Sequence, residues 1–280
     1  MFGMAAVMAV VSSPQSGPKE PALPDNAKQF VSEMVKHELE AEEKDHSHWM
    51  YRLHREDDKG AQDRQVIETK DGQLAKTLLI NGQPLTADQR EKDQERMQKL
   101  VSDPEERARR ERRIKQDEEK AMQLLKAIPD AFIFKYEGTE GELIRLSFTP
   151  NSNYSPPTRE LLVYHSMKGK LWVDRAAMRL AKIEGQLIED VKFGWGLLGH
   201  LDKGGTFTVV QKHVGDSHWE TVSLDLNMQG RALMFKTINV RQKQVLTDFH
   251  RVPDDLSIAK AFEILQKGET SVFANSHSGK

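Results

Sequence analysis

Between Ile133 and Val252 the chain is a succession of short segments in which apolar and polar residues alternate, separated by turns that contain glycine. In Thr221–Leu226, for example, every second residue is apolar. A period of two predicts β-strands, and this many of them predict a large antiparallel sheet. The expected strands are Phe132–Glu137, Glu142–Thr149, Glu160–His165, Gly169–Asp174, Ala177–Glu189, Gly205–Val214, His218–Met228, Ala232–Val240 and Gln244–Val252.

Three further strands are expected earlier in the chain, at His48–Asp57, Gln62–Thr69 and Gln73–Ile80. Asp71-Gly72 between the last two is a tight hairpin signal. A sheet of about twelve strands is too wide to stay flat, so it should curl into an unclosed barrel.

Helical periodicity occurs in three places. Asp25 or Asn26 can cap a helix that runs to about Lys44, and Pro253–Asp255 precedes a last helix, Leu256–Lys267, which Gly268 ends. The segment 86–128 is rich in charge, with 22 of its first 35 residues charged, 11 acidic and 11 basic. Ser102-Asp103-Pro104 should divide it into two helices, because Ser and Asp cap helices and Pro suits a first turn.

These patterns predict an α+β fold: a large curved antiparallel sheet with an N-terminal helix, a charged helical insertion and a C-terminal helix. We expect one β-rich domain over residues 25–268, with the insertion at 86–128. Residues 14–24 contain four prolines and predict a linker, and residues 269–280 predict a flexible tail.

The N-terminus predicts export. Phe2–Val11 is an apolar stretch of small residues and Met, and Val11-Ser12-Ser13 would serve as a cleavage site, so residues 1–13 are interpreted as a signal peptide for the periplasm. A positively charged start is missing, and a start codon assigned too late would account for that. No stretch approaches the ~20 apolar residues that a membrane span needs, so the mature protein should not span a membrane.

Charge and cysteine content exclude several classes of function. Lys plus Arg (41) nearly balance Asp plus Glu (43), so the net charge of the protein gives no reason to expect nucleic acid as a partner. The arginines between Arg107 and Arg113 suggest phosphate binding, but acidic neighbours such as Glu106 and Glu111 offset them along the chain. With no cysteine there is neither a disulfide framework nor a thiolate metal site.

The sequence carries no nucleophile, dinucleotide-binding or phosphate-loop motif, and we expect neither enzymatic activity nor a cofactor. His46, His48 and His54 share a parity on an expected strand, which makes them weak candidates for a metal site. A metal-dependent hydrolase is therefore a minor hypothesis, weighed against a solvated row of histidines.

One face of the expected sheet is apolar over many strands, more than a C-terminal helix can cover. Either the charged helices cover it with their few apolar residues, or it stays partly open for an apolar ligand. The residues expected to line it, which could equally be ordinary core, are Trp172, Phe207, Val209, Val222, Leu224, Leu233, Phe235 and, from a glycine-rich apolar loop, Trp195.

The stretch Gly169–Asp174, followed by Arg179–Gly185, resembles the outer-membrane lipoprotein-sorting family, which comprises LolA- and LolB-like carriers and the related RseB sensors. Trp219–Thr221 and Thr247–Phe249 resemble later strands of that family. The resemblance covers about Arg159 to Val252 and implies an unclosed barrel with a helical lid, whose apolar hollow takes acyl chains. The insertion at 86–128 is a departure from a minimal carrier, and no residue here matches the family's ligand-gating basic residue.

Together these observations predict a non-enzymatic periplasmic protein that binds lipid or an acylated protein in an apolar half-barrel. The alternative is an envelope scaffold or sensor that docks a protein partner through the charged insertion.

Overall fold

The computed structural model describes residues 25–193, 199–232 and 236–268. One antiparallel sheet of thirteen strands dominates it. Its strands are β1 (His48–Asp57), β2 (Gly60–Thr69), β3 (Gly72–Ile80), β4 (Gln83–Pro84), β5 (Phe132–Glu140), β6 (Leu143–Pro150), β7 (Met167–Asp174), β8 (Arg179–Leu187), β9 (Val191–Phe193), β10 (Gly199–Leu201), β11 (Thr206–Gly215), β12 (His218–Ala232) and β13 (Lys236–Val252). The order across the sheet is β4-β3-β2-β1-β13-β12-β11-β8-β7-β6-β5, and the short β9 and β10 extend from β12.

The helices begin and end at the residues that capping chemistry favours. In α1 (Ala27–Lys44) the Asn26 side chain accepts from the Gln29 amide, and in α2 (Ala87–Ser102) Thr86 forms a capping box with Gln89. Asp103 caps α3 (Pro104–Ala131), which has Pro104 at its first position. Helix α4 (Ile258–Lys267) ends at Gly268, whose φ of 71° is left-handed. A 3₁₀ helix, η1, spans Glu160–Ser166.

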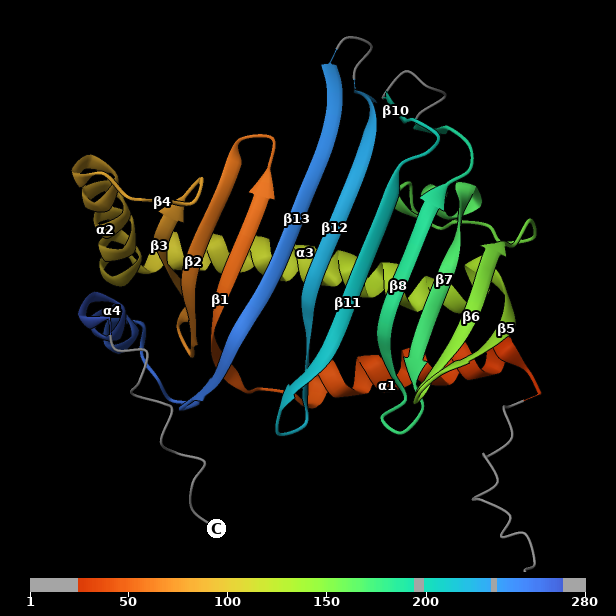
Figure 1. Cartoon of the computed structure of the whole chain (residues 1–280), viewed down its shortest axis with the longest axis horizontal. Coiled ribbons are helices and arrows are strands. Elements are labelled where there is room, and N and C mark those ends of the chain that lie inside the picture. Colours follow the sequence, from red (N-terminus) through yellow and green to blue (C-terminus); the bar gives the residue numbers. More distant parts are fainter. Residues whose placement is uncertain (1–24, 194–198, 233–235, 269–280) are drawn as a thin grey trace, which may run out of the picture.

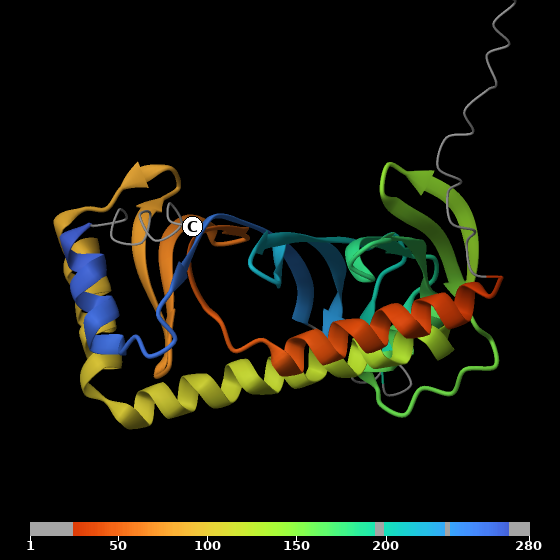
Figure 2. The ribbon, with the colours of Figure 1, turned by 90° about the horizontal axis from the view of Figure 1, so that it is seen from below.

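Helices α1 and α3 lie together on one side of the sheet, and α3 crosses behind its central strands from the β3 end toward the β5 end (Figure 1). The view from below separates these helices from the strands, and it shows α2 and α4 stacked at the β3 end (Figure 2). The predicted α+β architecture with a curved, unclosed sheet is therefore confirmed.

Two apolar cores join the helices to the sheet, and a third, smaller cluster lies within β1–β3 and β13. The larger joins α1 and the C-terminal end of α3 to β5–β8 and η1, with side chains such as Val31, Met34, Leu146 and Leu171 fully buried. The smaller joins α2 and α4 to β1–β3, around Met50, Ile67 and Met97. The middle of α3 belongs to neither core.

Two facing glycines let the sheet bend between β7 and β8. Gly169 pairs with Gly185, and a Cβ on Gly169 would overlap the backbone of β8 at the Glu184 carbonyl. The rings of Phe148 and Phe207 cover these glycines from the helix-facing side. Glycine is required here because the two backbones approach too closely for a side chain.

Two predicted strands were wrong. Residues 160–165 form η1, because Leu161 and Tyr164 are buried three residues apart, which is the period of a 3₁₀ helix. The segments 232–240 and 244–252 belong largely to one strand, β13, since Arg241–Lys243 contains no turn-forming residue and the chain runs straight through.

A buried ion pair attaches α1 to the sheet. A Glu38 carboxylate oxygen lies 2.9 Å from the Arg179 Nε and accepts from the Leu180 amide at 2.6 Å. Glu38 is 5% exposed, so a charged carboxylate at this position has to be stabilised by these partners instead of by water. The ion pair thereby adds to the hydrophobic packing of α1 and fixes where the helix lies along β8.

Replacing Glu38 with Ala should destabilise the protein by about 3–5 kcal/mol, because Arg179 would be left buried without its counter-ion. The control is Glu40→Ala on the same helix, whose pairs with Lys36 and Lys44 are exposed to solvent, so the change in stability should be much smaller. Urea unfolding measures both. Equal losses for the two variants would contradict the assigned role of Glu38.

Candidate functional site

The helix-facing side of the central strands contains a patch of half-buried apolar residues, which we call the bridged face. Val209 lies directly opposite Ile183 and Leu224, and Phe207 lies opposite Leu226. Cross-strand partners point to the same side of a sheet, so all five share one face. Ile183, Phe207 and Leu226 pack at the margin of the larger core, whereas Val209 and Leu224 lie beyond it and stay half-buried.

Helix α3 spans this region without packing tightly on it. All eleven residues from Glu111 to Ala121 are exposed, including Ile114 at 38%. The C-terminal end of α3 is buried at Ile128 and Ala131, and near its N-terminal end Arg107 donates to the Leu100 and Val101 carbonyls of α2. A helix that is polar all round and anchored at both ends is a bridge rather than a cover.

A hollow of about 460 Å³ lies where α3 passes the ends of β2 and β3, and we call it the α3–β2 hollow. This volume is in the usual range for small-molecule sites. Its apolar lining comes from Leu100, Ile114 and Ile258, and its polar lining includes Glu68, Gln73 and Arg110. Such a mixture suits an amphipathic molecule better than a purely apolar one.

Only some of the predicted ligand-binding residues lie together on the bridged face. Phe207, Val209 and Leu224 lie on the bridged face, and the half-buried Val222 sits in a β-bulge, since Ser223 and Thr221 pair with successive residues of β11. Trp195, Leu233 and Phe235 lie outside the described residues.

Trp172 lies on the opposite face. It alternates with the core residues Leu171 and Val173, its indole NH donates to Glu140 at 2.9 Å, and the Lys182 ammonium lies 4.4 Å from its ring centre. Long charged side chains therefore bury it from the solvent side. The prediction that Trp172 lines the same face as Phe207 has no support from this geometry, because strand alternation sends it the other way.

The three candidate metal-binding histidines do not converge. His54 pairs with Asp63 at 2.8 Å, His48 lies 4.0 Å from Asp254, and His46 is exposed in the connection between α1 and β1. Six residues along one strand separate His48 from His54 by about 20 Å. Within the described residues, no group of three or more His, Asp or Glu side chains is placed to hold a metal ion.

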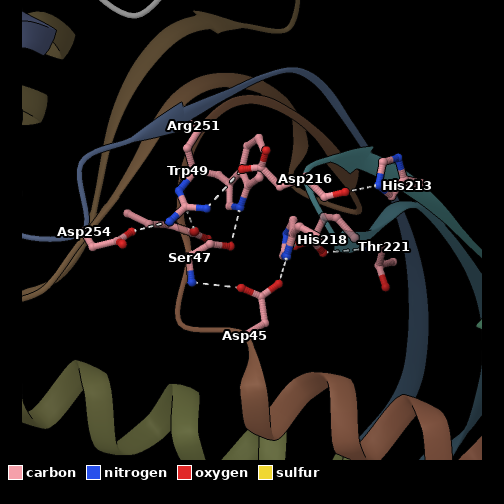
Figure 3. Close-up of polar contacts among 11 residues, drawn as sticks. Asp45, Ser47, Trp49, His213, Asp216, His218, Thr221, Arg251 and Asp254 are labelled. Carbon is pink, nitrogen blue, oxygen red and sulfur yellow. Dashed lines mark hydrogen bonds and ion pairs between the residues drawn. The ribbon is translucent and has the colours of Figure 1, made fainter. Parts of the chain in front are cut away.

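A polar cluster connects the end of α1 to the start of β12 (Figure 3). His218 Nδ1 lies 2.5 Å from Asp45, its Nε2 lies 3.5 Å from Glu220, and its ring stacks on Trp49 with the ring centres 5.1 Å apart. The Trp49 indole NH donates to the Ser47 hydroxyl at 2.7 Å, and its amide donates to Glu68 at 3.0 Å.

Both ring nitrogens of His218 face carboxylates, so the histidine is held as a cation rather than placed against a nucleophile. Burial lowers the pKa of His218, but the hydrogen bonds to Glu220 and Asp45 outweigh it and the net pKa is raised. Burial raises the pKa of Glu68 to about 7, with repulsion from Glu220 adding to the shift. The raised pKa values favour the protonated forms of both side chains.

Sequence reasoning missed this cluster because its members come from three distant segments. Asp45 and His218 are 173 residues apart, and neither belongs to a recognisable motif. The only local signal was the Gly215-Asp216 turn, which places His218 at the start of a strand.

No protein-family model matches the chain, and no curated protein matches it in sequence. None of the described helices combines the length and apolar character needed to cross a bilayer.

We expect the free energy of unfolding to fall as the pH rises from about 5 to about 8. A folded-state pKa raised above the unfolded value contributes stability below the unfolded pKa and loses it as the pH passes through the folded one, and this holds for both Glu68 and His218. Glu68→Gln should remove about 1–3 kcal/mol of this dependence.

Chemical denaturation at several pH values measures the effect. The control is Glu56→Gln, at an exposed position on β1. A Glu68→Gln profile as steep as that of the control would show that Glu68 does not hold its proton in the folded protein.

Proposed function

We propose that the protein is a non-enzymatic carrier or sensor that binds the acyl chain of a lipid or an acylated protein against the bridged face. The observation that carries the proposal is that Val209 and Leu224 are only half-buried on the helix-facing side of the sheet, while α3, on that side, has eleven consecutive exposed residues. The chain's own helices leave that apolar surface incompletely covered, and a guest of matching character would complete its burial.

The size of the effect is adequate for useful affinity. Each buried methylene group contributes about 0.8 kcal/mol, so about ten of them supply roughly 8 kcal/mol before the costs of association. That gross value corresponds to a dissociation constant of about 1 μM. The fixed ends of α3 would let its middle move outward to admit a chain without unfolding either core.

The setting that fits this role is the periplasm, where a carrier for acylated molecules must shield them from water. The expected signal peptide at residues 1–13 supports that setting, and so does the resemblance of Arg159–Val252 to lipoprotein-sorting carriers. The signal peptide lies outside the described residues.

Leu224→Asp should weaken binding of a fluorescent fatty acid by at least about tenfold, because it places a charge where the acyl chain would lie. The matched control is Ser223→Asp, since Ser223 points to the other face of the same strand and should bind as the wild type does. Fluorescence titration gives both affinities, with circular dichroism as the check on folding.

If Leu224→Asp fails to fold, Leu224→Trp tests the same point by filling the space instead of charging it. Mass spectrometry of lipids retained by the purified wild-type protein provides an independent measurement. Absence of retained lipid together with equal fatty-acid affinity in all variants would overturn the proposal.

An alternative function, docking of an envelope protein on α3, is favoured by the same exposed segment. Arg112 and Glu119 lie two turns apart on it and are both exposed. Replacing both with Ala would abolish capture of a protein partner under this alternative, while fatty-acid binding would stay unchanged.

A further inference from the structure

The strongest concentration of positive charge in the described part of the chain lies in a second hollow, between α2, α3 and β2. It has a volume of about 600 Å³, and we call it the arginine hollow. Its lining contains six basic side chains and two acidic ones. The basic residues are Arg64 from β2, Lys92, Arg96 and Lys99 from α2, and Arg110 and Arg113 from α3.

The acidic residues near this hollow are already engaged by other partners. Glu106 lies 2.6 Å from Arg109 and 3.8 Å from Lys99, and Asp93 pairs with Arg96 at 2.7 Å. Glu95 is exposed at the rim. The ion pairs formed within the described residues include none with Arg64, Arg110 or Arg113.

The protein does not satisfy every donor of Arg64. Its guanidinium donates to the Gln62 side chain, but its Nε is buried and has no hydrogen-bond partner in the protein. A buried donor of this kind is costly unless something accepts from it. Burial and repulsion from Arg96 lower the pKa of Arg64, and burial together with Arg96, Arg64 and Arg113 lowers that of Arg110.

We propose that the arginine hollow binds a phosphate group of a phosphorylated ligand. Three guanidinium groups from two different elements line one space, where basic side chains outnumber acidic ones, and their planar forks match the paired oxygens of a phosphate. Bound phosphate would neutralise the mutual repulsion of these guanidinium groups.

Acidic and basic residues are balanced along the helical insertion, but in the folded protein the basic side chains predominate around the arginine hollow. Arg110 and Arg113 are three residues apart and share one side of α3, which faces the hollow, whereas Glu111 lines the α3–β2 hollow instead. Arg110 and Leu100 line both hollows, so the two spaces are adjacent. A ligand with its phosphate in the arginine hollow could place an apolar part beside Leu100.

The phosphate could belong to a lipid head group or to a soluble molecule, and two probes separate these sources. Calorimetric titration with inorganic pyrophosphate at low ionic strength tests the soluble source. Sedimentation with vesicles of phosphatidylcholine and phosphatidylglycerol in equal parts, compared with phosphatidylcholine alone, tests the head group.

The test variant is Arg110→Gln with Arg113→Gln, and the matched control is Arg112→Gln, which is exposed on the same helix and does not line the hollow. We expect saturable pyrophosphate binding that the double variant weakens at least about tenfold and the control changes by less than about twofold. Thermal unfolding verifies that both variants fold, and Arg113→Gln alone is the milder replacement if the double variant does not.

Binding of pyrophosphate but not of anionic vesicles would identify a soluble ligand, and binding of both would identify a head group. No binding of either probe, or equal binding by the double variant and the control, would overturn the assignment. Fatty-acid binding measured through Leu224→Asp is independent of this result, so the phosphate site and the acyl site can fail separately.

Discussion

The structure depends on how a very wide sheet is held by very few helices. The eleven neighbouring strands of the main sheet path, with ten spacings of about 4.8 Å, would span about 48 Å if flat, and the 28 residues of α3 span about 42 Å. One helix can thus reach nearly across a curved sheet of this size, but it cannot cover it. Its C-terminal end is buried in the larger core, its N-terminal end is joined to α2 through Arg107, and its middle is left exposed.

This constraint explains the composition of α3. A helix that bridges two cores needs apolar residues only where it is anchored, which is why Leu124, Leu125 and Ile128 gather at its C-terminal end. Its middle must be soluble on every side, and alternating charges achieve that while supporting helicity through neighbouring pairs. Tyr164 strengthens the anchored end by donating from its hydroxyl to the Leu124 carbonyl at 2.9 Å.

The polar clusters lie at the places where these elements meet. Asp45 and His218 join the end of α1 to the sheet, and Glu38 and Arg179 attach its middle, so α1 is fixed by charge as well as by packing. Where α2 turns into α3, in contrast, the arginines meet without compensation. The first two clusters pair acidic with basic side chains, and the last is the place where we propose that a phosphate group binds.

The local sequence pattern predicted most of the strands and helices correctly, and it failed at two places. The caps at Asn26 and Asp103 marked two helix starts, because capping is chemistry between residues two or three apart. The segment at Glu160–Ser166 was misassigned because a short apolar run fits a strand and a buried 3₁₀ turn equally well. β13 was divided in error at Arg241–Lys243, since the expected change of strand was inferred from spacing and not from turn residues.

The sequence by itself determined the α+β class, most element boundaries and the alternation that gives the sheet one apolar face. Only the tertiary structure decided which residues share a site: that Trp172 faces away from Phe207, that Asp45 reaches His218, and that Arg64 meets Arg110 and Arg113. The physical reason is range. Periodicity and capping act over a few residues, whereas burial, charge compensation and the open space beneath α3 depend on contacts between segments that are far apart in the chain.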